Sequence, residues 1–267
     1  MPGLSSWVVR LSEALSCVLP RLALLALMCT FSLPATAGQV TVAVASNFLK
    51  PLESLRPVFE MTSRHTLVIS GGSTGQLYAQ IRHGAPYDVM LSADEERPRL
   101  LEQEGNGVAE TRFTYAVGKL VIWCPGTASI VTDALAILAR KEFRALAMAN
   151  PELAPYGLAA KQTLEQLHLW EPLRDRFVLG QDIGQSFSMV HTGNAELGFV
   201  ALSQLLNPAI ADAGNHWEVP ADLHDPILQQ AILLIHGKDN PAAREFIDFL
   251  KGEAARRVIT EFGYGTE

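Results

Sequence analysis

The stretch TLVISGGSTGQLYAQIRH at residues 66–83 joins an apolar segment to an amphipathic one through a loop of glycine and hydroxyl residues. TLVI predicts a strand, and the residues from Gly75 onward predict a helix. Within the loop, Gly71, Ser73 and Gly75 match the G-x-S-x-G pattern of serine hydrolases. A polar turn into a helix can equally hold an anion, because a helix N-terminus presents unpaired N–H groups. Both interpretations predict a strand–loop–helix unit.

Units of this kind repeat along the chain, and they predict an α/β fold. Short apolar runs predict strands at 40–45, 66–69, 88–93, 119–124, 145–149, 177–180, 197–202 and 231–236. Amphipathic stretches between them predict helices near 48–62, 75–83, 95–104, 132–140, 157–168, 184–192 and 241–261. Most of the strands are apolar throughout, which is typical of parallel strands covered on both faces. The pattern leaves open whether the chain forms one doubly wound sheet or two smaller α/β lobes.

The first 37 of the 267 residues have the pattern of a secretory signal peptide. Arg10 and Arg21 precede an apolar run at 22–33, and Ala35 and Ala37 occupy the −3 and −1 positions of an A-x-A cleavage site. The apolar run is too short for a stable membrane-spanning helix. We therefore predict cleavage after Ala37 and export of residues 38–267.

The composition of the exported part excludes several functions. Removing two arginines and one glutamate with the signal changes the formal charge from −7 to −8, and no basic run remains, so nucleic-acid binding is not expected. Cys124 is the one cysteine left, which excludes a disulfide framework and predicts a packed thiol in a buried strand. The histidines and cysteines lack metal-site spacings, so no metal site is predicted.

Four predicted helices begin with residues suited to holding an anion. Ser46-Asn47, Ser73-Thr74, Tyr156-Gly157 and Asp182-Ile183 each stand where a strand or loop enters a helix. Ligands of open α/β sheets bind outside the carboxyl ends of the strands, where these features are expected. Ser, Asn and Asp are also ordinary helix caps, and capping alone accounts for any single member. Asp182 is best explained as a cap, because its carboxylate would repel an anion.

The hydrolase interpretation finds little further support. Ser73 lies close to the start of the exported chain, whereas the α/β-hydrolase plan places several strands and an oxyanion loop before its nucleophile. No HGGG-type stretch exists, and no histidine stands beside an evident partner. A P-loop is excluded because Gln76 follows Gly75 where that motif requires lysine. Ser73 is therefore predicted to shape the loop.

Several longer motifs resemble the periplasmic molybdate-binding proteins of ABC importers. They are VAVASNF, GSTGQLYAQIRHGAPYDVMLSAD, ANPELAPYGLAAKQTLEQL, GNAELGFVALSQ and FLKGEAARRVITEFGYG. They occur in the expected order and span nearly the whole exported chain. The resemblance implies a two-lobed type II periplasmic-binding-protein fold, with a ligand cleft between lobes that are each a mainly parallel sheet flanked by helices. It places the signal peptide at 1–37, the first lobe at 38–117 and 226–267, and the second lobe at 118–225.

The resemblance also implies a set of ligand-binding residues. It assigns the hydroxyl and main-chain N–H of Ser46 and the hydroxyl of Thr74 to one side of the oxyanion. Relatives often have serine at the position of Thr74. It assigns the main-chain N–H groups of Tyr156 and Ile183 to the other side. Thr74 keeps the hydroxyl of that serine and adds a methyl group.

One position departs from many relatives. They carry a tyrosine hydroxyl after the G-[IF]-V strand, and here that position is Ala201 in GFVALSQ. The resemblance to the subgroup with SNF and APYG implies that the Asn47 side chain and the Tyr156 hydroxyl replace the lost donor.

The function implied by this resemblance is capture of molybdate or tungstate by neutral hydrogen-bond donors, without metal, cofactor or catalysis. The protein is expected to be a periplasmic monomer that delivers its ligand to the membrane permease of an ABC importer. Sulfate or phosphate binding is the alternative within binding proteins, since the same donors suit any tetrahedral anion. Serine hydrolysis at Ser73 is the alternative among enzymes.

Overall fold

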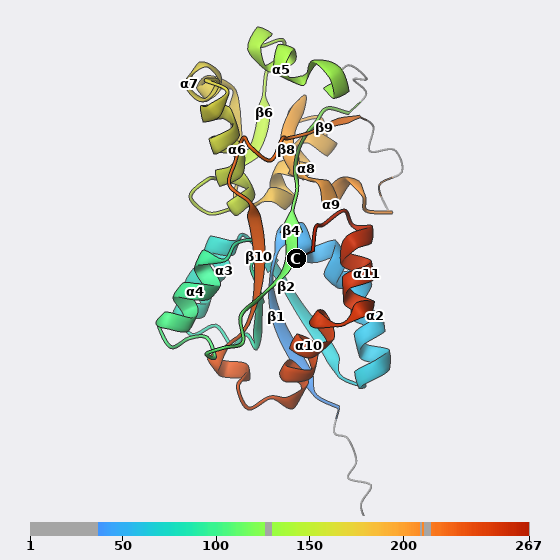
Figure 1. The fold of residues 1–267 in the computed structure, drawn as a ribbon. Helices are drawn as coiled ribbons and strands as arrows, with labels where there is room; N and C mark the ends of the chain where they lie inside the picture. Colours follow the sequence, from blue (N-terminus) through green and yellow to red (C-terminus); the bar gives the residue numbers. More distant parts are fainter. Residues whose placement is uncertain (1–36, 126–129, 209, 211–214, 267) are drawn as a thin grey trace, which may run out of the picture. The chain divides into compact units, whose positions relative to one another are not determined.

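The computed structural model describes residues 37–125, 130–208, 210 and 215–266. The predicted signal peptide therefore falls outside the described residues, except for Ala37. The described chain contains two five-stranded sheets (Figure 1). None of its helices combines the length and hydropathy needed to cross a membrane.

The first sheet has the strand order β2-β1-β3-β10-β4. Its strands are β1 (Gln39–Ala45), β2 (Thr66–Gly72), β3 (Val89–Leu91), β4 (Phe113–Gly118) and β10 (Ile227–Leu233). β1 runs parallel to β2 and β3, whereas β10 runs antiparallel to β3 and β4. A register shift between Gln229 and Gln230 forms a bulge where β10 pairs with β4.

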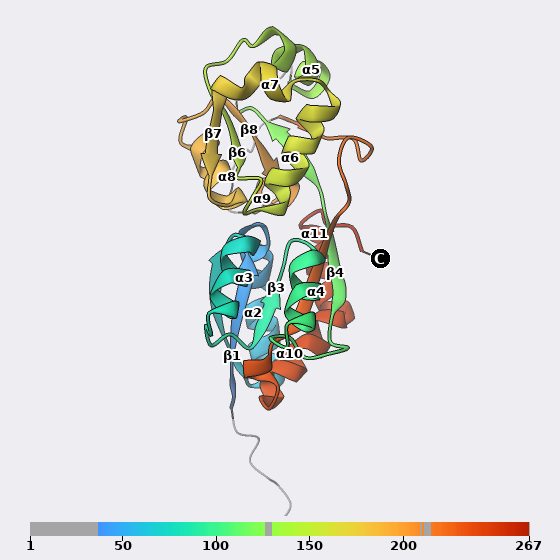
Figure 2. The same cartoon turned by 90° about the vertical axis from the view of Figure 1, so that its left-hand side faces the viewer.

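Helices cover both faces of the first sheet (Figure 2). The larger cluster packs α2 (Leu49–Ser63), α10 (Pro241–Lys251) and α11 (Glu253–Glu261) against one face. The smaller cluster packs α3 (Thr74–Arg82) and α4 (Glu96–Gln103) against the other. Because both faces are covered, most strand residues are apolar rather than alternating with polar ones, with Gln229 and Gln230 of β10 among the exceptions.

The second sheet has the order β7-β6-β8-β5-β9. Its strands are β5 (Leu120–Trp123), β6 (Leu146–Ala149), β7 (Phe177–Gly180), β8 (Leu197–Ala201) and β9 (His216–Glu218). Its helices are α5 (Ile130–Arg140), α6 (Pro155–Gln166), α7 (Trp170–Leu173), α8 (Ile183–His191) and α9 (Leu202–Leu205). Single 3-10 turns occur at η1 (Ser46–Phe48), η2 (Arg174–Arg176) and η3 (Ile235–Gly237). β6 is parallel to β7 and β8, and β5 is antiparallel to β8 and β9.

The chain passes between the sheets twice. Lys119 alone separates β4 of the first sheet from β5 of the second, and residues 219–226 lead from β9 back to β10. The order of the elements thus gives the first sheet both ends of the described chain. The second sheet is formed by the segment between the two crossings.

The predicted two-lobed α/β fold is confirmed, with corrections in detail. The sheets are mixed rather than mainly parallel, because β5 and β10 run against their neighbours. Periodicity could not reveal this, since strands buried on both faces are apolar in either direction. The helix predicted at 241–261 is two helices that meet at Gly252, and the strand predicted at 231–236 occupies Ile227–Leu233. Strands β4 and β9 and the short helices α7 and α9 were not predicted.

Candidate functional site

The five predicted ligand-binding residues line one small pocket. Ser46 and Asn47 follow β1, Thr74 begins α3, Tyr156 lies in the first turn of α6, and Ile183 begins α8. The full lining is Ala45, Ser46, Asn47, Gly72, Ser73, Thr74, Ala93, Ala154, Pro155, Tyr156, Asp182 and Ile183. Its cavity volume is about 10 Å³, far below the roughly 300 Å³ at which pockets for drug-sized molecules begin. The pocket is therefore narrow, with the residues of its lining close together.

Main-chain N–H groups at three helix starts remain free at this pocket. In the described part of the chain, no hydrogen bond engages the N–H of Thr74, Tyr156 or Ile183. All three residues are buried, and a buried N–H without an acceptor costs free energy. Each helix also contributes a partial positive charge at its N-terminus, of about half an elementary charge. An anion in the pocket would satisfy all three groups.

Two hydroxyl groups add donors to the same pocket. Ser46 Oγ accepts a hydrogen bond of 3.2 Å from the N–H of Gly184, and Thr74 Oγ1 accepts one of 3.1 Å from the N–H of Ala93. A hydroxyl that accepts in this way still has its own hydrogen to donate. The bonds from Gly184 and Ala93 therefore orient the Ser46 and Thr74 hydroxyls as donors toward a ligand.

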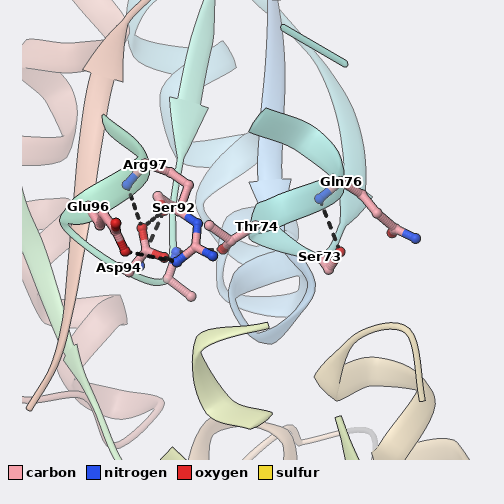
Figure 3. A network of polar contacts seen from close by, with 8 residues as sticks. Ser73, Thr74, Gln76, Ser92, Asp94, Glu96 and Arg97 are labelled. Carbon is pink, nitrogen blue, oxygen red and sulfur yellow. Dashed lines mark hydrogen bonds and ion pairs between the residues drawn. The ribbon is translucent and has the colours of Figure 1, made fainter. Parts of the chain in front are cut away.

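A polar cluster fixes the turn that contains Ala93 (Figure 3). The carboxylate of Asp94 accepts hydrogen bonds from Ser92 Oγ at 3.0 Å, from the N–H of Arg97 at 3.0 Å and from the Arg97 guanidinium at 2.8 Å. Burial raises the pKa of the Asp94 carboxyl, although Arg97 acts in the opposite direction. Because the cluster holds Ala93 in place, it also holds the N–H that orients the Thr74 hydroxyl.

Ser73 and Asp182 serve as helix caps, as the sequence predicts. Ser73 Oγ accepts a hydrogen bond from the N–H of Gln76 at the start of α3 (Figure 3), and Asp182 Oδ1 accepts one from the N–H of Gln185 at the start of α8. Ser73 is buried, and no hydrogen bond joins it to a histidine in the described residues. A nucleophile needs a base within hydrogen-bond reach, so this geometry does not support a hydrolase.

Hydrogen bonds connect the two sheets around the pocket. The N–H of Gly75, in the first turn of α3, donates to the carbonyl of Leu153 at 2.9 Å. Gln76 Nε2 donates to Gln181 Oε1 at 2.9 Å, and the bond between Gly184 and Ser46 is a third connection. Elements from both sheets therefore meet directly beside the free N–H groups.

The side chains of Asn47 and Tyr156 belong to a buried polar network. Asn47 Nδ2 donates to Gln229 Oε1 and to the Tyr264 hydroxyl, each at 2.9 Å. Gln229 Nε2 donates to the Tyr156 hydroxyl at 3.1 Å, and the Tyr115 hydroxyl donates to Gln229 Oε1 at 3.1 Å. Both amide hydrogens of Asn47 are thus engaged within the protein.

The hydrogen bonds of Asn47 and Tyr156 bear on whether these residues replace the hydroxyl that is missing at Ala201. Ala201 is fully buried at the end of β8 and provides no hydroxyl, as the sequence states. The resemblance to the subgroup with SNF and APYG implies that the Asn47 amide and the Tyr156 hydroxyl replace the missing donor. In this structure both amide hydrogens of Asn47 bond to Gln229 and Tyr264, so the Asn47 amide holds the pocket wall and offers no free donor, whereas the Tyr156 hydroxyl accepts from Gln229 and keeps its own hydrogen.

Burial raises the pKa of the network tyrosines. The pKa of Tyr264 rises to about 12, mainly through burial, and the pKa values of Tyr115 and Tyr156 rise well above their usual range for the same reason. The phenols therefore stay neutral at physiological pH, as their hydrogen bonds require.

An alkaline loss of stability follows from these pKa values. A group with a raised pKa in the folded state stabilises the protein fully below its unfolded pKa, which is near 10 for tyrosine. That stabilisation is lost as the pH rises toward 12. We expect the urea midpoint of unfolding to fall steeply between about pH 10 and about pH 12. The fall should be shallower in Tyr264→Phe, and an equal slope in the two proteins would contradict the assignment.

The lining of the candidate site contains no cation among the described residues. Asp182 is the one charged residue in that lining, and its carboxylate is occupied as a cap. No cluster of three or more His, Cys, Asp or Glu suited to a metal ion occurs in the part of the chain that the structure describes. The donors available to a ligand are neutral hydroxyl and main-chain N–H groups.

Sequence reasoning missed several residues around the pocket. Gly75 and Gly184 contribute through main-chain N–H groups, which no side chain signals. Gln229 and the tyrosines at 115 and 264 come from elements distant in the chain, and only the fold brings them together. One available signal was the pair Gln229-Gln230 inside an otherwise apolar strand.

Comparison with known proteins identifies the family. The model of a family described as bacterial extracellular solute-binding protein matches residues 40–265. The molybdate-binding protein ModA of Azotobacter vinelandii is 48% identical over 235 residues, which are 87% of this chain and 92% of the relative. ModA of Rhodobacter capsulatus is 42% identical over 91% of this chain and 94% of the relative. The solved periplasmic molybdate-binding protein of Azotobacter vinelandii superposes with a TM-score of 0.81 at 41% identity, covering 85% of this chain and 99% of that structure.

These matches extend over nearly all the described residues and include both sheets. They agree with a pocket that offers hydrogen-bond donors and no catalytic group. The chain belongs to the family of bacterial extracellular solute-binding proteins, whose members bind solutes rather than catalyse reactions.

Proposed function

We propose that this protein binds molybdate or tungstate in the pocket at the starts of α3, α6 and α8. The observation that carries the proposal is the set of free N–H groups at Thr74, Tyr156 and Ile183, which converge with two hydroxyls on one small neutral pocket. A tetrahedral dianion accepts many hydrogen bonds at once, and this pocket offers donors from opposite sides. The high identity to two molybdate-binding relatives supports the choice of anion.

The proposed donors can supply the required affinity. A hydrogen bond to a charged group contributes about 1.5–3 kcal/mol, and micromolar binding requires about 8 kcal/mol. The hydroxyls of Ser46 and Thr74 and the N–H groups of Thr74, Tyr156 and Ile183 are enough to reach this range. Asn47 lines the pocket, and we assign its amide to the supporting network. The net negative charge would slow the approach of an anion, so selectivity depends on pocket size and donor geometry.

We further propose the domain organisation that goes with this function. The first lobe comprises 38–117 and 226–267 and the second comprises 118–225, with the crossings at Lys119 and at 219–226 as the hinge. Hinge closure would bring the donors of both lobes onto the oxyanion. The loaded protein would act as a monomer in the periplasm, after cleavage of residues 1–37, and deliver its ligand to the permease of an ABC importer.

Thermal denaturation tests the proposed ligand. At a ligand concentration of about 100 times the dissociation constant, binding stabilises the folded state by about 2.7 kcal/mol. We expect molybdate and tungstate to raise the melting temperature of residues 38–267 clearly, and sulfate and phosphate at equal concentration to do little. Equal shifts with sulfate would instead assign the pocket to sulfate.

A further inference from the structure

We propose that Gln229 is a positioning residue, which holds the oxyanion donors of the two sheets in register without touching the oxyanion. This inference rests on the proposed function and assigns a role to a residue outside the pocket lining. Gln229 is fully buried in β10, at the bulge that interrupts the pairing of β10 with β4. Bulges commonly re-aim side chains next to functional sites.

The carboxamide of Gln229 joins residues from both sheets. Its Oε1 accepts hydrogen bonds from Asn47, which follows β1, and from Tyr115 in β4, both of the first sheet. Its Nε2 donates at 3.1 Å to the hydroxyl of Tyr156, at the start of α6 beside the second sheet. One side chain therefore connects two pocket-lining residues, Asn47 and Tyr156, across the boundary between the sheets.

The main chain packs tightly against the bond between Gln229 and Tyr156. Gly118 ends β4 just before the crossing at Lys119, and a Cβ atom there would collide with the Tyr156 hydroxyl and lie 2.7 Å from Gln229 Nε2. Only glycine allows the two groups to approach the crossing so closely. The bond between Gln229 and Tyr156 is thereby packed against one of the two segments that link the lobes.

The network acts on the ligand through the main chain. Tyr156 carries one of the three free N–H groups, and its phenol is anchored by Gln229, so the anchor fixes the first turn of α6. Asn47 adjoins Ser46, whose hydroxyl is another proposed donor. Binding energy depends on donors being held in place before the ligand arrives. Loss of Gln229 should therefore weaken ligand binding although the residue lies outside the pocket.

Gln229→Glu tests this role with a minimal change of shape. A carboxylate can still accept from Asn47 and Tyr115, but it cannot donate to Tyr156, whose hydroxyl would have to turn and donate instead. Its charge also disfavours a nearby dianion. We expect the affinity for molybdate, measured by calorimetry at pH 8, to fall by more than 10-fold. Because protonation of the introduced carboxyl group would restore a donor, the ratio of parent to variant affinity should shrink as the pH falls from 8 to 5.5.

Gln230→Glu is the matched control. The Gln230 side chain forms hydrogen bonds with Arg112 at 2.8 Å and with Thr114 at 3.4 Å. Thr114 lies in β4 of the first sheet and Arg112 directly precedes that strand, so neither bond reaches the second sheet. This variant should bind molybdate within about two-fold of the parent at every pH. A pH-independent ratio for Gln229→Glu, or equal losses in the two variants, would overturn the proposal.

Tyr156→Phe provides a second route that leaves Gln229 intact. It removes the acceptor of the cross-sheet bond but keeps the main-chain N–H of residue 156. We expect a loss of about 10-fold, and a smaller loss from adding Gln229→Leu to this variant than the same change causes in the parent, because both changes break the bond between Gln229 and Tyr156. Fully additive losses would contradict the coupling. If the parent protein itself bound no molybdate, the proposed function would fail, whereas binding unaffected by these variants would reject only the role of Gln229.

Discussion

Replacing Thr74 by alanine is expected to weaken molybdate binding by about 10- to 150-fold. The change removes a hydroxyl that we propose donates to the oxyanion, in a site where Thr74 is only 1% exposed. A lost hydrogen bond to a charged group costs about 1.5–3 kcal/mol, which corresponds to that range of affinity. The N–H of Ala93 also loses its acceptor, so the ligand-free variant should be less stable. Calorimetric titration and urea unfolding separate the two effects.

Thr74→Ser and Ser73→Ala are the controls for this result. Serine keeps both the donor and the acceptor for Ala93, so Thr74→Ser should bind nearly as well as the parent. Ser73→Ala removes the cap bond to Gln76, which costs about 1 kcal/mol of stability but leaves the pocket donors in place. Ester hydrolysis that depends on Ser73, or molybdate affinity unchanged in Thr74→Ala, would argue against oxyanion binding by this loop.

The sequence predicted the positions of the helix starts better than the direction of the strands. The starts at Thr74 and Ile183 lie within one residue of their predictions, because hydroxyl, amide and carboxylate caps mark them locally. The antiparallel direction of β5 and β10 depends on where the chain crosses between sheets. That crossing leaves no local pattern, so periodicity alone could not predict it.

The same distinction between local signals and long-range contacts applies to the residues of the candidate site. Ser46 and Thr74 carry hydroxyls beside glycine-rich or strand-ending motifs, so their residue types indicate a donor. The contacts of Gln229 with Asn47 and Tyr156 span 182 and 73 residues of sequence, and no spacing rule predicts them. The five residues that the family resemblance names line one pocket, but the resemblance assigns the Asn47 amide to the ligand. Side-chain geometry assigns it to the network.

Gly75→Val is expected to lower molybdate affinity by about 5- to 150-fold through a steric effect between the lobes. Gly75 lies in the first turn of α3, and its N–H donates to the carbonyl of Leu153 at 2.9 Å. A Cβ atom at this position would lie 3.0 Å from that carbonyl oxygen and 3.3 Å from the Leu153 Cα, and both neighbours are main-chain atoms. Overpacking of this kind costs about 1–3 kcal/mol. The cost arises only when the two sheets approach as in this structure.

Gly75→Ala distinguishes such a closure effect from general damage to the protein. Alanine favours a helix over glycine by up to about 1 kcal/mol, so the ligand-free variant should unfold at the same or higher urea concentration than the parent. Its Cβ still crowds Leu153, so its molybdate affinity should fall, and the two measurements should move in opposite directions. Ala79→Val, on an exposed position of the same helix, introduces a comparable side chain away from Leu153. It should lose a little stability and no affinity, and equal affinity losses at positions 75 and 79 would show that the effect is not one of closure.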